Sequence, residues 1–168
     1  MECLVPVQKS QQPLQSLMSD ISLGKLKLPE IQREYVWKPT QVANLVESLY
    51  LGYPTGSLLL WQTDDLPEER PLDIGESQAR PQVQPTYLLD GQQRLTSLHR
   101  ALRRDDHLNP GKFIEIVFNV VTEEFQNESA ATKKDRRWVR VADIAAPEAD
   151  LFDIAEQCFE NVDGLARK

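Results

Sequence analysis

The sequence TYLLDGQQRLTSLHRAL, residues 86–102, predicts a short buried strand that turns directly into a helix. Residues 86–89 are typical of a strand, and the residues after the turn repeat apolar side chains at helical spacing: Leu95, Leu98, Ala101 and Leu102. Between them, Asp90-Gly91 marks a tight turn. A helix N-terminus exposes unpaired backbone N–H groups, and a glycine there lets an anion approach the backbone. The junction is therefore a candidate phosphate-binding site.

Taken as a dipeptide alone, Asp90-Gly91 favours an ordinary turn, followed by a solvated first helical turn made of Gln92, Gln93 and Arg94. Two features favour a ligand instead. The helix dipole disfavours an arginine in the first turn, so we expect a carboxylate or a bound phosphate to stabilise Arg94. A two-residue hairpin turn would also lead into a strand, whereas the residues that follow are strongly helical.

Helical and strand patterns alternate along the chain on both sides of this junction. The spacing predicts helices at 14–23, from Thr40 as an N-cap to just before Gly52, and at 151–159. Four further segments have strand-like patterns: 26–28, 57–61, 112–121 and 138–141. The run 57–61 is apolar enough for a strand buried on both faces. We therefore expect a single α/β (α+β) domain over residues 1–168, with a small mixed sheet surrounded by helices.

Two segments have a composition typical of surface connections. Residues 62–85 contain four prolines and almost no periodicity, which predicts a variable surface loop. The polar residues 122–137 predict an exposed connection between the strand at 112–121 and its partner strand at 138–141.

The bulk composition limits the location and the partners. The 168 residues are 40% hydrophobic and carry a net charge of −7, which opposes nonspecific nucleic-acid binding by the chain as a whole. Because neither an export signal nor a membrane-spanning stretch is evident, we expect a cytoplasmic protein with no membrane partner. Cys3 and Cys158 lack metal-site or disulfide spacing, so both are interpreted as reduced thiols.

Two other segments can carry chemistry. In QREYVW, residues 32–37, Arg33 could offer a planar fork to a phosphate, and Tyr35 or Trp37 could stack on a base. From this segment alone, a loop whose two aromatic residues anchor on the core is the better interpretation. The turn around Gly56 in YPTGS, residues 53–57, could line a site with its backbone N–H groups, although such turns more often only reverse the chain.

Together, QREYVW, the G-x-P-x-G turn and DGQQRLTSL at residues 90–98 resemble the N-terminal domain of GmrSD-type restriction endonucleases. The likeness runs in order from about residue 14 to 104. It implies a ParB/sulfiredoxin-like fold, and nucleotide binding and hydrolysis that regulate cleavage of foreign, often modified, DNA in bacteria. Carried over by position, it implies a nucleotide-site motif with two companion residues: Asp90, Gly91, Gln92, Gln93 and Arg94, with Gln32 and Arg33.

The chemistry of such a site follows from its side chains. Helix N-terminal N–H groups would hold phosphate oxygens, while Arg94 and Arg33 would offset charge on a transferring phosphoryl group. Asp90 would hold a Mg²⁺ ion or orient a water, and Gln92 or Gln93 would position that water. A nucleoside triphosphate and Mg²⁺ are thus the expected ligands. No G-x-x-x-x-G-K-[ST] loop is present, which excludes an ordinary P-loop ATPase.

Three observations bear on alternative functions. The chain has two histidines, His99 and His107, and lacks the His-Asn-His nuclease region of the family, so DNA would be engaged through a further C-terminal region or a partner. A ParB-like DNA-binding or nuclease module without nucleotide turnover would use the basic residues at 94–104 and 133–137, but interleaved carboxylates favour solvated faces. A noncatalytic interaction domain or homodimer is the third alternative, because the apolar face of the predicted final helix would have to be buried against a partner or a second copy.

Overall fold

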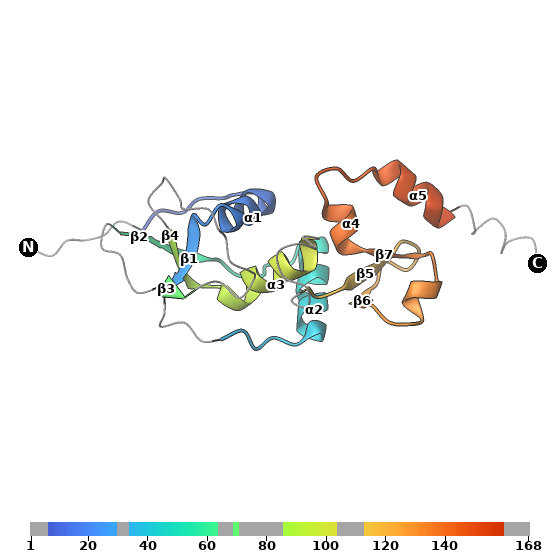
Figure 1. The fold of residues 1–168 in the computed structure, drawn as a ribbon, viewed down its shortest axis with the longest axis horizontal. Helices are drawn as coiled ribbons and strands as arrows, with labels where there is room; N and C mark the ends of the chain where they lie inside the picture. Colours follow the sequence, from blue (N-terminus) through green and yellow to red (C-terminus); the bar gives the residue numbers. More distant parts are fainter. Residues whose placement is uncertain (1–6, 30–33, 64–68, 71–85, 104–112, 160–168) are drawn as a thin grey trace, which may run out of the picture.

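Two small sheets lie on either side of a central pair of helices in the computed structural model (Figure 1). The structure describes residues 7–29, 34–63, 69–70, 86–103 and 113–159. Helices and strands alternate along the chain, which confirms the predicted mixed α/β class. None of the described helices is both long enough and apolar enough to cross a lipid bilayer.

The first sheet has the order β2-β4-β1-β3, with the strands β1 (Leu26–Pro29), β2 (Leu59–Gln62), β3 (Glu69–Arg70) and β4 (Thr86–Asp90). Strand β4 pairs with β1 in parallel and with β2 in antiparallel fashion, which confirms the predicted mixed sheet. Because β4 is flanked on both sides, Tyr87 and Leu88 are completely buried. The strand that leads into the DGQQR motif is therefore an inner strand of this sheet.

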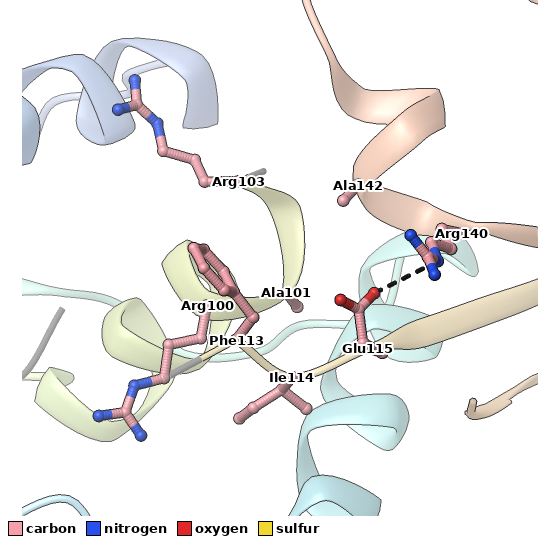
Figure 2. A pocket seen from close by; sticks show the side chains of 8 residues that line it. All are labelled: Arg100, Ala101, Arg103, Phe113, Ile114, Glu115, Arg140 and Ala142. Atoms are coloured by element: carbon pink, nitrogen blue, oxygen red, sulfur yellow. Dashed lines mark ion pairs between the residues drawn. The ribbon is translucent and has the colours of Figure 1, made fainter. Parts of the chain in front are cut away.

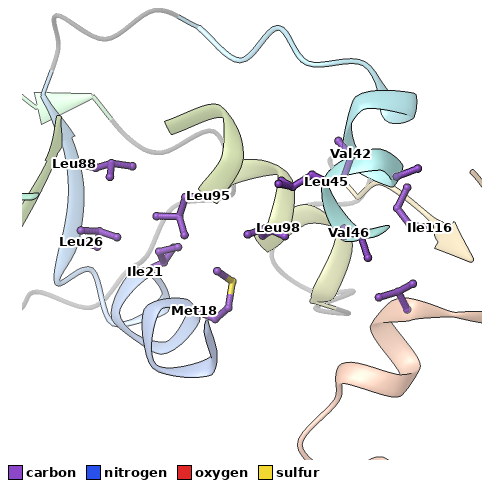
Figure 3. Close-up of a cluster of buried hydrophobic side chains, with 13 residues drawn as sticks. Met18, Ile21, Leu26, Val42, Leu45, Val46, Leu88, Leu95, Leu98 and Ile116 are labelled. Atoms are coloured by element: carbon purple, nitrogen blue, oxygen red, sulfur yellow. The ribbon is translucent and has the colours of Figure 1, made fainter. Parts of the chain in front are cut away.

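Three helices contribute to the core beside this sheet: α1 (Leu14–Ser22), α2 (Pro39–Tyr50) and α3 (Gln92–Leu102). Helix α1 contacts β1, and α2 packs on α3 and on the second sheet. Their apolar faces form one continuous core with β1 and β4 (Figure 3). In it, Leu95 of α3 lies near Ile21 of α1, and Leu98 lies towards α2. The core members that Figure 3 labels are Met18, Ile21, Leu26, Val42, Leu45, Val46, Leu88, Leu95, Leu98 and Ile116.

The second sheet is antiparallel with the order β6-β5-β7, made of β5 (Ile116–Asn119), β6 (Phe125–Asn127) and β7 (Trp138–Arg140). Tyr50 of α2 packs against Phe118 and Phe125, with ring centroids 5.4 and 5.3 Å apart, and this joins the sheet to the central helices. A short 3-10 helix, η1 (Thr132–Lys134), precedes β7, and α4 (Val141–Ala145) and α5 (Leu151–Phe159) follow it. Helix α5 buries Cys158 but leaves Phe152 88% exposed.

The predicted strand at 57–61 forms, but it is not buried on both faces. It is the edge strand β2, in which Leu59, Leu60 and Trp61 are 50, 40 and 38% exposed. An apolar run shows that a segment suits a strand, whereas its position in the sheet depends on strand pairing. Trp61 still gains cover from Tyr87 on β4, with ring centroids 6.0 Å apart.

Three local predictions also change. Lys38, not Thr40, is the N-cap of α2, because Pro39 suits the first helical position and the Gln41 side chain accepts the Lys38 backbone N–H at 2.9 Å. The connection predicted at 122–137 contains β6 and η1, and helix α4 was not predicted. Within 62–85, the described residues 69–70 form β3 beside β1, and most of the predicted loop lies outside the described residues.

Candidate functional site

The predicted strand-to-helix junction is present at the centre of the first sheet. Strand β4 ends at Asp90, Gly91 is the N-cap of α3 with φ of 95°, and the helix begins at Gln92. A side chain at Gly91 would be strained at this φ, and its Cβ would lie 2.3 Å from Leu58 Cδ2. Glycine is therefore favoured here by the backbone conformation, while an added Cβ would also displace the end of the Leu58 side chain.

Arg94 folds back from α3 onto the turn that precedes β2. Its Nη1 donates to the Thr55 carbonyl and its Nη2 to the Ser57 carbonyl, each at 2.8 Å. Nη2 also lies 3.2 Å from Asp90 Oδ2, so a carboxylate, one of the two kinds of partner expected from the sequence, stabilises Arg94. Gly56 has φ of 89°, and a Cβ there would lie 2.5 Å from Arg94 Nη1. We call this arrangement of Arg94 around Gly56 the arginine clamp.

Asp90 is the most accessible ionisable group of the junction, with its side chain 72% exposed. Magnesium ions at phosphate sites commonly use one or two protein carboxylates, with phosphate oxygens and water as the other ligands. Asp90 fits that single-carboxylate role. Among the described residues, no group of three or more His, Cys, Asp or Glu side chains could hold a metal ion.

Gln93 uses both ends of its carboxamide to hold the segment before α2. Its Nε2 donates to the Glu34 carbonyl at 3.0 Å, and its Oε1 accepts the Val36 backbone N–H at 2.9 Å. The side chain is nearly buried, at 7% exposure. The geometry therefore gives Gln93 a positioning contact, while its predicted role in orienting a water stays a prediction.

Tyr35 attaches the same segment to α3 one turn further on. Its hydroxyl lies 2.9 Å from Ser97 Oγ, and Ser97 Oγ donates to the Gln93 carbonyl at 2.6 Å. The Arg100 guanidinium lies over the Tyr35 ring, 4.1 Å from its centroid. We call these contacts the tyrosine clasp. They favour the anchoring interpretation of QREYVW over base stacking by Tyr35.

Trp37 also supports the anchoring interpretation, since it packs against the hydrophobic core. The two companion residues predicted upstream, Gln32 and Arg33, lie outside the described residues. The structure therefore brings Asp90, Gly91, Arg94 and Gly56 into one cluster.

Gln92 and Thr96 form a second buried polar face on α3. Their exposures are 7 and 1%, and neither Gln92 Oε1 nor Thr96 Oγ1 has a hydrogen-bond partner in the part of the chain that the structure describes. A buried polar group without a partner costs about 1–3 kcal/mol. Sequence reasoning did not identify Thr96, although its position four residues after Gln92 places both on one helical face.

The basic residues of α3 contact other parts of the protein. Arg94 bonds two backbone carbonyls, Arg100 covers Tyr35, and Arg103 Nη1 donates to Ser22 Oγ. A cation already engaged in this way is less available to a DNA phosphate, and this weighs against the ParB-like DNA-binding alternative. His99 is buried in α3, in line with a packing role.

A cavity of about 70 Å³ lies between the C-terminal end of α3 and the residues before β5 (Figure 2). The guanidinium groups of Arg100 and Arg103 extend away from each other, and Arg140 faces Glu115 across an ion pair of 3.6 Å. Pockets for drug-sized ligands have volumes of about 300–1,000 Å³. This cavity is therefore too small to hold a nucleotide.

A larger cleft of about 670 Å³ lies between the second sheet and α5. Glu128 lies at its wall, where Lys133 Nζ and Arg140 Nε approach its carboxylate to 2.9 and 3.0 Å. Burial raises the pKa of Glu128, but the hydrogen bonds from Lys133 and Arg140 outweigh it and lower the pKa below its ordinary value. No residue of the DGQQR motif lines this cleft, and two of its cations, Lys133 and Arg140, already pair with Glu128.

Comparisons with known proteins identify one matching family and one similar protein. Residues 14–162 match the family described as the GmrSD restriction endonuclease, N-terminal domain. An uncharacterized protein of Methanocaldococcus jannaschii is 29% identical over 127 residues, which cover 68% of this chain and 22% of that protein. The chain thus spans about a fifth of the length of this relative.

Proposed function

Because this chain belongs to the GmrSD restriction endonuclease N-terminal domain family, which implies a role in restriction, we propose that the domain binds a nucleoside triphosphate with Mg²⁺ and hydrolyses it. Nucleotide state would regulate cleavage of DNA that a further region or a partner engages. The larger size of the relative in Methanocaldococcus jannaschii is compatible with such a further region.

The observation that carries this proposal is the β4–α3 junction. The inner strand β4 is followed by Gly91 in the left-handed conformation, and an eleven-residue helix begins directly after it. Backbone N–H groups of the first helical turn have no partner within the helix, and the helix dipole favours a negative charge beside them. These groups would hold phosphate oxygens.

Within this proposal, Asp90 and Arg94 have different roles. The exposed carboxylate of Asp90 would bind Mg²⁺ that bridges phosphate oxygens. Arg94 would act mainly by holding the turn at residues 55–57 against the junction, since two of its N–H groups already bond backbone carbonyls.

The test is titration of the whole chain with ATP, GTP, CTP and UTP, each with Mg²⁺, by calorimetry and by phosphate release. Asp90→Asn should weaken Mg²⁺-dependent binding or turnover by about 10–100-fold, the range seen when groups around a metal ion are altered. Asp153→Asn, at an exposed position of α5, is the matched control and should behave as the wild type. The proposal is wrong if the wild type binds none of the four, or if Asp90→Asn binds and turns over nucleotide normally.

A further inference from the structure

Helix α3 has two adjacent polar faces that differ in one respect. On the face of Gln93 and Ser97, both ends of the Gln93 carboxamide and the Ser97 hydroxyl have hydrogen-bond partners. On the face of Gln92 and Thr96, two side-chain oxygens have none among the described residues. Along the same two turns of α3, the polar side-chain atoms are therefore hydrogen-bonded on one face, whereas two side-chain oxygens lack a described partner on the other.

The unpaired atoms lie beside the helix N-terminus. Gln92 is the first residue of α3, and Thr96 follows at four residues, so their side chains are neighbours on one face. Helical side chains lean towards the N-terminus of their helix, which brings the Thr96 hydroxyl towards the level of Gln92. At 7 and 1% exposure, neither side chain can rely on bulk water. Buried polar groups in native proteins nearly always have a partner, in the protein or in bound water.

The chemistry of the two atoms restricts that partner. Gln92 Oε1 only accepts hydrogen bonds, so its partner must carry an O–H or N–H group, and an ionised phosphate oxygen does not qualify. The Thr96 hydroxyl can donate or accept. A hydroxyl group or a water molecule suits both atoms, because it donates to Gln92 while accepting from Thr96.

We propose that Gln92 and Thr96 form a hydroxyl-binding subsite beside the phosphate position. Its occupant is either a ribose hydroxyl of the nucleotide or a water held next to the bound nucleotide. This inference rests on the proposed nucleotide binding. It adds a pair of side chains that would hydrogen-bond an uncharged hydroxyl group or water beside the phosphates. It also separates the two glutamines of the motif: Gln92 contacts the ligand side, and Gln93 positions the segment at 34–36.

The experiment is calorimetric titration of the whole chain with the nucleoside triphosphate that binds best, and with its 2′-deoxy and 3′-deoxy forms. Thr96→Val keeps the shape of the side chain but removes the hydroxyl, and Gln92→Met does the same for the amide. Both should weaken binding of the ribonucleotide about tenfold, or about 1.4 kcal/mol. Neither should lower the stability of the ligand-free chain towards urea, because no internal hydrogen bond is removed.

Thr132→Val is the matched control, because Thr132 is also buried but its hydroxyl bonds Ser129 at 2.8 and 3.0 Å. It should lower stability and leave nucleotide affinity unchanged. If the loss in Thr96→Val disappears with one deoxynucleotide, the occupant is that ribose hydroxyl; an equal loss with all three forms identifies a bound water.

Wild-type affinity in both Thr96→Val and Gln92→Met would overturn the subsite while leaving nucleotide binding intact. A wild-type chain that binds no nucleoside triphosphate would instead overturn the proposed function, and the subsite with it.

Discussion

The arginine clamp predicts a strong energetic coupling between Gly56 and Arg94. Arg94→Ala removes two hydrogen bonds from a charged donor to the carbonyls of Thr55 and Ser57. Such bonds contribute about 1.5–3 kcal/mol each, and the partial exposure of Arg94, 21%, favours the lower end. The ion pair with the exposed Asp90 adds little. We therefore expect Arg94→Ala to lower the free energy of unfolding by about 3 kcal/mol.

Gly56→Ala should break the same clamp from the other side. Its new Cβ would lie 2.5 Å from Arg94 Nη1, so the guanidinium must swing out. The alanine would also be strained at φ of 89°, by about 1–2 kcal/mol. The expected total loss is about 4–5 kcal/mol from the sum of clamp and strain. In an Arg94→Ala background only the strain remains, so the double variant should also lose about 4–5 kcal/mol.

Urea unfolding of the wild type, both single variants and the double variant measures this coupling, with linear extrapolation to water. We expect a coupling free energy of about 3 kcal/mol, whereas independent sites add within about 0.5 kcal/mol. Gly52→Ala is the control, since Gly52 also has a positive φ of 71° but no atom within 4 Å of an added Cβ. Additive losses for Gly56 and Arg94 would refute the clamp as described.

Two further predictions concern the tyrosine clasp and the second sheet. Tyr35→Phe should lower the free energy of unfolding by about 1 kcal/mol, because the hydrogen bond to α3 is lost while the ring contact remains; urea unfolding measures it. Because Lys133 and Arg140 lower the folded-state pKa of Glu128, its ion pairs should stabilise the fold above about pH 4.5 and lose this effect as pH falls through that lowered pKa. Glu128→Gln should therefore reduce the loss of unfolding free energy as the pH falls below about 4.5, whereas Glu156→Gln on α5 should not. An equal loss in the wild type and in Glu128→Gln would contradict the ion-pair geometry.

Local patterns were enough to predict most of the elements. Helices α1, α2 and α5 were expected from apolar spacing, and the pairing of the last two predicted strands is confirmed, with Phe118 opposite Val139. The β4–α3 junction was expected because a turn glycine and helical periodicity are both visible within about ten residues. The sequence could not show that β2 lies at a sheet edge, because its own composition suits either position.

The roles of individual side chains depended on distant parts of the chain. The sequence predicted that Arg94 needs a partner, and Asp90, four residues away, was one within reach. The carbonyls of Thr55 and Ser57 lie 39 and 37 residues away along the chain, and the Gln93 contacts lie 57 and 59 away. Such contacts follow from the packing of α3 against two other segments, which no local pattern encodes.

The amino-acid sequence alone therefore established the family, the strand-to-helix junction and its glycine, because each depends on residues close together in the chain. Tertiary packing alone distinguished Gln93, whose amide holds residues 34–36, from Gln92, whose oxygen has no partner among the described residues. The two glutamines are neighbours in sequence, but the helix turns by about 100° between them and directs them to different surroundings.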